Sequence, residues 1–112
     1  MLYEMRSYWI ESGEVDAYLD WANNRALPVL QGEFGFRLVG FWRVRDVEGP
    51  AGEDHPNVVW LLAWRDREER DRKWEAARAS ASWAKINEGR PRFHRRPGSM
   101  RFLEGIPRSP LQ

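Results

Sequence analysis

The chain has no cysteine and only two histidines, His55 and His94, and these shortages limit its chemistry. Without thiols it can form neither disulfides nor thiolate metal sites, and it has no cysteine nucleophile. Two imidazoles are too few for a multi-histidine metal site within one chain. We therefore expect neither a metal ion nor a cofactor.

The chain also lacks an excess of either charge sign, and it lacks long apolar runs. Lys and Arg number 18 and Asp and Glu 17, for a net charge of +1, so nothing draws the whole chain to nucleic acid or to an anionic membrane. No apolar stretch approaches the roughly 20 residues that span a bilayer. We expect a cytoplasmic globular protein that forms one domain over residues 1–112.

Hydrophobic periodicity divides the first half of the chain into a strand, a helix and a second strand. Residues 2–10 alternate between two faces, as in a strand. From Glu14 the apolar residues recur every three or four positions, which predicts an amphipathic helix. This helix should end or kink near Ala26, because Pro28 lacks the N–H that a helix interior needs. Residues 36–47 alternate again and predict the second strand.

The second half adds a buried strand, a capped helix and a short final strand. After a Gly- and Pro-rich loop, the run VVWLLAW at 58–64 is apolar throughout, as in a strand buried on both faces. Asp66 followed by Glu69 predicts the N-cap and capping box of a helix. Residues 99–104 predict the last strand, and we expect the tail 105–112, with its two prolines, to be irregular.

The order β-α-β-β-α-β predicts an α+β, ferredoxin-like fold with four antiparallel strands and both helices on one face. The second and third strands are apolar on both faces, so the helix-free face needs a cover. We expect a second copy of the same sheet to supply it, which gives a homodimer. The alternative is a monomer with a partly apolar, exposed sheet.

Four segments, in order, resemble the NIPSNAP family: YEMRSYWIESGEVDAYL at 3–19, RLVGFW at 37–42, NVVWLLAWRDREER at 57–70 and IPRSPL at 106–111. The resemblance implies a dimeric α/β barrel. The wider barrel group includes cofactor-free monooxygenases, isomerases, cyclases, haem-degrading enzymes and ligand binders, with cavities between sheet and helices. The chain has Trp60 and Leu62 where many members have His and Trp, which favours an apolar pocket over chemistry at that imidazole.

Glu4, Arg6 and Tyr8 share one face of the first strand, and they are our first candidates for catalytic residues. Arg6 could anchor a carboxylate or enolate, with Tyr8 as a hydrogen-bond donor or acid. Burial would turn Glu4 into a general base only if Arg6 did not hold it ionised. The structural alternative is a salt bridge or a dimer contact.

Candidate ligand-binding residues are aromatic and basic. Trp42, Trp60 and Trp64 occupy even-numbered positions of the second and third strands, where they could form an aromatic floor with Trp74 or Tyr18 as its lid. The alternative for these tryptophans is ordinary core packing. Arg43 on the second strand could bind an anionic group, and its alternative is a solvated side chain.

His94 is the strongest acid–base candidate among the histidines. Neighbouring arginines disfavour its cationic form, and a neutral imidazole can act as a general base. His55, in a Gly- and Pro-rich loop, is a weaker candidate. The Arg-rich segment 90–108 could bind RNA or phosphate, but it carries no groove-reading helix or Gly-rich phosphate loop. We expect it to be a solvated edge or an intersubunit ion-pair zone.

These observations leave three functional hypotheses. The first is a cofactor-independent enzyme of the isomerase, cyclase or monooxygenase type, acting on a small aromatic or polyketide-like carbonyl compound. The second is a binding module for such a ligand without turnover, and the third is a dimeric scaffold. A cavity with Arg6, Tyr8 or His94 at its wall would favour the first two, and a closed interior would favour the third.

Overall fold

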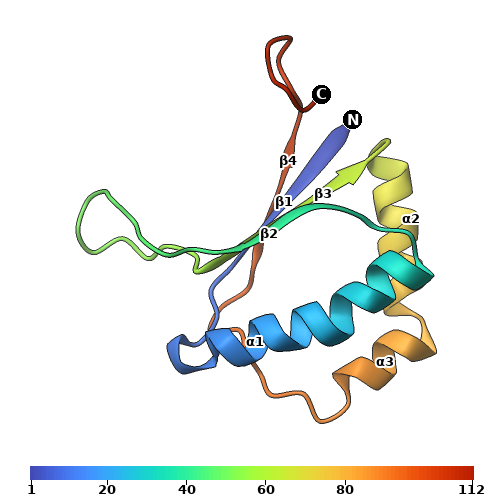
Figure 1. Cartoon of the computed structure of the whole chain (residues 1–112), viewed down its shortest axis with the longest axis horizontal. Helices are drawn as coiled ribbons and strands as arrows, with labels where there is room; N and C mark the ends of the chain where they lie inside the picture. Colours follow the sequence, from blue (N-terminus) through green and yellow to red (C-terminus); the bar gives the residue numbers. More distant parts are fainter.

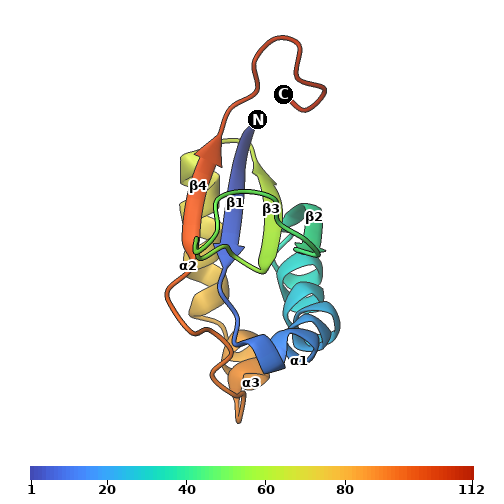
Figure 2. The same ribbon diagram turned by 90° about the vertical axis from the view of Figure 1, so that its left-hand side faces the viewer.

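A computed structural model describes all residues, 1–112, and its order of elements is β-α-β-β-α-α-β. The strands are β1 (Leu2–Tyr8), β2 (Arg37–Arg43), β3 (Val58–Trp64) and β4 (Ser99–Leu103), and the α-helices are α1 (Val15–Trp21), α2 (Arg67–Arg78) and α3 (Ala81–Asn87). The sheet order is β2-β3-β1-β4, antiparallel throughout. The helices lie on one side of the sheet (Figures 1 and 2). The predicted α+β, ferredoxin-like fold is confirmed.

The first helix is longer than the sequence predicts, because Pro28 does not end it. A short 3-10 turn, η1 (Ser12–Glu14), precedes α1, and wider π-type turns follow it in η2 (Ala22–Ala26) and η3 (Pro28–Glu33). The amide of Leu27 donates to the carbonyl of Ala22, five residues back. The wider turns shift the hydrogen-bond pattern around the missing N–H of Pro28, so the helix continues.

The predicted cap of α2 is present. The amide of Glu69 donates to Oδ1 of Asp66 at 2.8 Å. The carboxylate of Glu69 accepts from the amide of Arg65 at 3.2 Å, one residue before the position that a standard capping box uses. The next helix, α3, starts at Ala81 with Ser80 as its N-cap. In the folded chain α2 lies against β3, and α3 lies against α2 and η2.

The second strand is shorter than the predicted 36–47, and a β-bulge changes its faces. Leu38 pairs with Leu62 but Gly40 pairs with Leu61, so Val39 is an additional residue. Beyond the bulge, Phe41 points to the helices and Trp42 to the opposite side. The expectation that Trp42 shares a face with Trp60 is therefore wrong.

The hydrophobic core fills the space between the sheet and the helices, and its buried members include Tyr18, Trp60, Trp64 and Trp74. The helix-free face keeps large apolar side chains exposed, among them Val39, Trp42 and Leu103. The indole of Trp42 lies over Gly40, where a Cβ atom would approach Cζ2 of Trp42 to 2.2 Å. The tail 105–112 has no helix or strand. No helix has the length and apolarity that crossing a bilayer requires.

Candidate functional site

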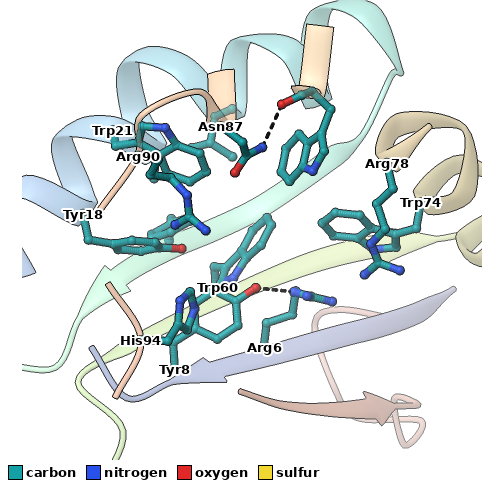
Figure 3. A pocket seen from close by; sticks show the side chains of 14 residues that line it. Arg6, Tyr8, Tyr18, Trp21, Trp60, Trp74, Arg78, Asn87, Arg90 and His94 are labelled. Atoms are coloured by element: carbon teal, nitrogen blue, oxygen red, sulfur yellow. Dashed lines mark hydrogen bonds between the residues drawn. The ribbon is translucent and has the colours of Figure 1, made fainter. Parts of the chain in front are cut away.

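A cavity of about 140 Å³ lies between the sheet and the helices (Figure 3). Its wall combines aromatic rings with polar groups from β1, α1, β2, β3, α2, α3 and the connector that precedes β4. The lining residues are Arg6, Tyr8, Tyr18, Trp21, Ala22, Leu27, Phe41, Trp60, Trp74, Arg78, Trp83, Asn87, Arg90 and His94. The cavity is smaller than the roughly 300 Å³ at which typical ligand pockets begin.

Beneath this cavity, the carboxylate of Glu4 is completely buried and accepts hydrogen bonds from four side chains. Arg6 donates from Nη1 at 2.6 Å and Arg70 from Nη2 at 2.8 Å. The indoles of Trp64 and Trp74 donate at 3.0 and 3.1 Å. Burial by itself would raise the pKa of Glu4, but the hydrogen bond from Arg70 and the charge of Arg6 outweigh it and lower that pKa to about 2. Glu4 is therefore ionised at neutral pH and does not line the cavity.

Arg6 and Tyr8 meet at the cavity wall because residues two apart on β1 share a face. Nε of Arg6 donates to the hydroxyl of Tyr8 at 2.6 Å, which leaves the hydroxyl hydrogen of Tyr8 free for another acceptor. The Arg6 guanidinium lies 4.6 Å from the ring centroid of Trp74 and 5.5 Å from that of Trp60. Its Nη2 donates no hydrogen bond to the protein. This arrangement can hold a carbonyl or enolate oxygen.

His94 comes from the connector before β4, and an isolated bridge with Ile10 holds it beside β1. Its ring centroid is 4.8 Å from that of Tyr8 and 5.8 Å from that of Tyr18. Burial, followed by the charges of Arg90 and Arg6, lowers the pKa of His94 below its usual value. The imidazole is therefore neutral near pH 7 and able to accept a proton.

Tyr18 on α1 faces the same space, and Figure 3 shows its hydroxyl pointing into the cavity. Burial raises the pKa of Tyr18, and the nearby Tyr8 adds to this effect against the opposing charges of Arg6 and Arg90. The hydroxyl therefore stays protonated across the physiological range. It can donate a hydrogen bond but cannot act as a base.

The predicted aromatic floor is only partly present. Trp60 lines the cavity and packs on Phe41, with ring centroids 5.1 Å apart, and Trp74 forms a neighbouring wall. Trp64 lies behind the wall, fully buried, where its indole holds Glu4. Trp42 lies on the helix-free face and is 51 % exposed.

The other sequence candidates lie outside the cavity. The side chain of Arg43 points to the helix side and pairs with Asp16 at the start of α1. His55 lies 3.3 Å from Glu53 in the loop between β2 and β3. In the Arg-rich segment, Arg95 and Arg96 both bind the carboxylate of Asp54 in that loop. Arg90 is the member of this segment that reaches the cavity, together with His94.

Sequence reasoning missed three important lining residues: Phe41, Arg78 and Arg90. Regular alternation over 36–47 would place Phe41 on the face opposite to Trp42, and nothing in that pattern indicates the bulge that brings Phe41 to the helix side. Arg78 follows Trp74 by four residues on α2, a spacing that places the two on one helix face and could have found it. Arg90 lies after α3 in an irregular connector, where no periodicity predicts its direction.

The fold and the cavity define a ferredoxin-like α+β protein with an aromatic, arginine-bearing pocket between sheet and helices. The family model described as NIPSNAP matches residues 3–102. The chain therefore belongs to the NIPSNAP family, and the resemblance seen in the sequence is confirmed. Among curated proteins, none matches the chain significantly.

Solved structures of low sequence identity share the fold. A NIPSNAP family protein of unknown function from Agrobacterium tumefaciens is 19% identical, with a TM-score of 0.81 over 100% of this chain and 94% of that one. An uncharacterised NIPSNAP domain protein from Burkholderia xenovorans is 24% identical, with a TM-score of 0.78 over 98% and 99% of the two chains. An antibiotic biosynthesis monooxygenase is 17% identical, with a TM-score of 0.56 over 96% and 100%. At these identities the likeness concerns the fold alone.

Proposed function

We propose that the chain is a homodimer that binds a small aromatic carbonyl compound in the cavity and converts it by cofactor-independent acid–base chemistry. One observation carries the proposal: Arg6, Tyr8 and the neutral His94 converge on one cavity with mainly aromatic walls. The aromatic walls suit a planar ring, and the polar groups suit the oxygen and the acidic proton of a carbonyl compound. The fold shared with an antibiotic biosynthesis monooxygenase is compatible with such chemistry.

In the proposed reaction, His94 removes a proton from the carbon next to the carbonyl group. The electron pair of the broken C–H bond moves to the carbonyl oxygen and forms an enolate, while the imidazole becomes cationic. The free Nη2 of Arg6 and the hydroxyl of Tyr8 donate to the enolate oxygen. Returning the proton from His94 to either end of the enolate completes the cycle. Glu4, ionised and outside the cavity, positions Arg6 rather than acting as a base.

The size of the cavity favours a ligand with a single ring. A cavity of about 150 Å³ is enough to enclose benzene, and the volume here is about 140 Å³. Trp74 and Arg78 also line an open groove along α2, next to the cavity. Because these two residues line both spaces, the groove is where a part of the ligand too large for the cavity would lie.

The proposed homodimer rests on the helix-free face of the sheet. Leu61 and Val59 on β3 are only half-buried in the single chain, and Trp42 lies beside them on β2. Large apolar surfaces of this kind rarely face water in soluble proteins. A second copy supplies a matching apolar face by symmetry.

A binding module without turnover is the second candidate, and the state of Glu4 favours it. With Glu4 held ionised by Arg6 and Arg70, His94 remains as the one general base at the wall. If His94 does not exchange protons with the ligand, the same pocket acts as a receptor. The scaffold hypothesis predicted a closed interior, so the cavity argues against it.

Acetophenone in D₂O tests the proposal, because loss of its methyl proton signal reports enolate formation directly. We expect the protein to bind acetophenone by calorimetry and to accelerate the exchange, and we expect His94→Ala to abolish the acceleration while binding remains. His55→Ala, which changes the loop histidine, is the matched control and should behave as the wild type. Binding without accelerated exchange would support the receptor function, and absence of binding would overturn both candidates.

A further inference from the structure

Three arginines from three parts of the chain reach the cavity wall: Arg6 from β1, Arg78 from the end of α2 and Arg90 from the connector after α3 (Figure 3). No Asp or Glu is among the lining residues. Positive side chains therefore outnumber negative ones at the cavity, although the whole chain carries a net charge of only +1.

The charge of Arg6 is compensated, since its Nη1 binds Glu4. The side chains of Arg78 and Arg90 have no carboxylate partner and donate no hydrogen bond to the protein. Each stacks on an aromatic ring instead: Arg78 lies 4.8 Å from the centroid of Trp74, and Arg90 lies 4.6 Å from that of Trp21. Stacking fixes the plane of a guanidinium and leaves its N–H edges available to a ligand.

The two arginines differ in depth. Arg78 is largely exposed, and it lines both the cavity and the outer groove along α2. Arg90 is half-buried, and Figure 3 shows its guanidinium beside Tyr18, on the opposite side of the cavity from Arg78. Burial and the charges of Arg6 and Arg70 lower the pKa of Arg78, so the positive charge of Arg78 is also incompletely compensated. Arg90 lies deeper, where a ligand enclosed by the cavity would meet it, and Arg78 lies at the mouth.

The charge of Arg90 acts on the cavity and not only on its own surroundings. It lowers the pKa of His94 and opposes the rise in the pKa of Tyr18, in both cases together with Arg6. The neutral His94 adds no positive charge, and no acidic side chain cancels the two arginines. The apolar walls strengthen this positive potential, because they screen it less than water does.

We infer that the cavity selects an aromatic ligand that carries a carboxylate, with Arg90 as the group that binds the carboxylate and Arg78 as a positive charge at the mouth. The inference rests on the proposed function, because it places the ring in the same cavity and the carbonyl group at Arg6 and Tyr8. A guanidinium edge matches a carboxylate with two parallel hydrogen bonds. The aromatic lining and the small volume favour a one-ring acid over a larger anion such as a nucleotide.

A matched pair of ligands separates this inference from the proposed function. In 4-acetylbenzoate and 4-acetylbenzamide the ring and the acetyl group are the same, and only the first is charged. By calorimetry we expect the wild type to bind the benzoate at least about tenfold more tightly, the difference that a charge-assisted pair supplies. We expect Arg90→Gln to reduce this preference to about twofold or less while the affinity for the benzamide stays the same.

Two further variants control for the loss of packing on Trp21. Arg90→Lys keeps the positive charge and should retain part of the preference for the benzoate. Arg92→Gln changes an exposed arginine outside the cavity and should alter neither affinity. Equal binding of the two ligands by the wild type, or a preference that survives in Arg90→Gln, overturns the inference and leaves the proposed function in place. Binding of neither ligand overturns both.

Discussion

Nη1 of Arg6 donates a hydrogen bond of 2.6 Å to Oε2 of Glu4, and both side chains are buried. This bond fixes the guanidinium of Arg6 between two partners, because its Nε at the same time donates to the hydroxyl of Tyr8. Arg70 adds a second cation to the same carboxylate from α2. This pair links the stability of the sheet–helix core to the orientation of the group that faces the ligand.

Replacing Glu4 by Gln should therefore destabilise the protein strongly. The substitution leaves Arg6 buried without a charged partner, and breaking a buried ion pair on one side costs about 3–5 kcal/mol. Chemical denaturation measures the loss. Glu75→Gln, an exposed position on α2, is the control and should stay within about 0.5 kcal/mol of the wild type. An equally small loss for Glu4→Gln would contradict the assigned role.

The pKa of Glu4 predicts a specific acid sensitivity. Folding lowers it from 4.5 to about 2, so the unfolded chain takes up this proton first as the pH falls. The free energy of unfolding should decrease between these two values, by about 3 kcal/mol from this one group. Above pH 4.5 the contribution is complete. Urea denaturation from pH 7 to pH 2.5 tests this, and Glu4→Gln should show a shallower decrease.

His94 should titrate below the usual value for histidine. Burial and the charges of Arg90 and Arg6 lower its pKa, and removing one of these charges should raise it. NMR titration of the imidazole signals measures the effect. We expect the pKa of His94 to increase in Arg90→Gln and to remain as in the wild type in Arg92→Gln. A His94 that titrates at or above the free value would argue against its role as a base at neutral pH.

Asp54 should hold the segment that carries His94. Its carboxylate binds Arg95 and Arg96, whose hydrogen bonds and charges lower the pKa of Asp54 to about 2. The amide of Arg95 also donates to the carbonyl of Trp9 at 2.9 Å. In Asp54→Asn we expect faster hydrogen exchange at residues 93–95. Glu53→Gln, at the neighbouring acidic residue, should leave this exchange unchanged.

The dimer depends on the helix-free face of the sheet, and Leu61 lies near its middle. Sedimentation of the wild type at micromolar concentration should give twice the mass of the 13.3 kDa chain. Leu61→Asp should give the single chain, because the symmetric contact would bring two carboxylates into an apolar interface. Asn23→Asp, an exposed change on the helix side, should remain dimeric. A wild type that sediments as one chain would disprove the dimer.

Much of the fold could be predicted from local patterns. The apolar run 58–64 coincides with β3, and Asp66 caps α2 as its spacing to Glu69 predicts. Both signals depend on residues that are neighbours in the chain, so tertiary packing did not alter the predicted strand or the predicted cap. At Pro28 the sequence leaves two outcomes open, an end or a kink of the helix, and only the structure shows that the helix continues, because turns can widen around a proline.

The sequence predicted those residues of the candidate site that lie on a strand without a bulge. Arg6 and Tyr8 lie on one face of β1, and Trp60 pairs with Arg6 across the sheet. Where the pleat is interrupted, the prediction failed: one additional residue at Val39 sent Trp42 away from the cavity and brought Phe41 into it. Arg90 could not be predicted at all, because its direction is set by the connector that β4 and α3 constrain from both ends.

By itself the amino-acid sequence determined the four strands and two of the three α-helices in their order, the shared face of Glu4, Arg6 and Tyr8, and, through motifs spread along the chain, the membership of the NIPSNAP family. The strands, the helices and the shared face follow from periodicities within a few residues of one another. Only the tertiary structure decided which charges remain uncompensated. Glu4 is neutralised by an arginine 66 residues away, while Arg78 and Arg90 meet aromatic rings and an open cavity. Compensation of charge depends on distances in space, and these exist only once the sheet and its helices have packed together.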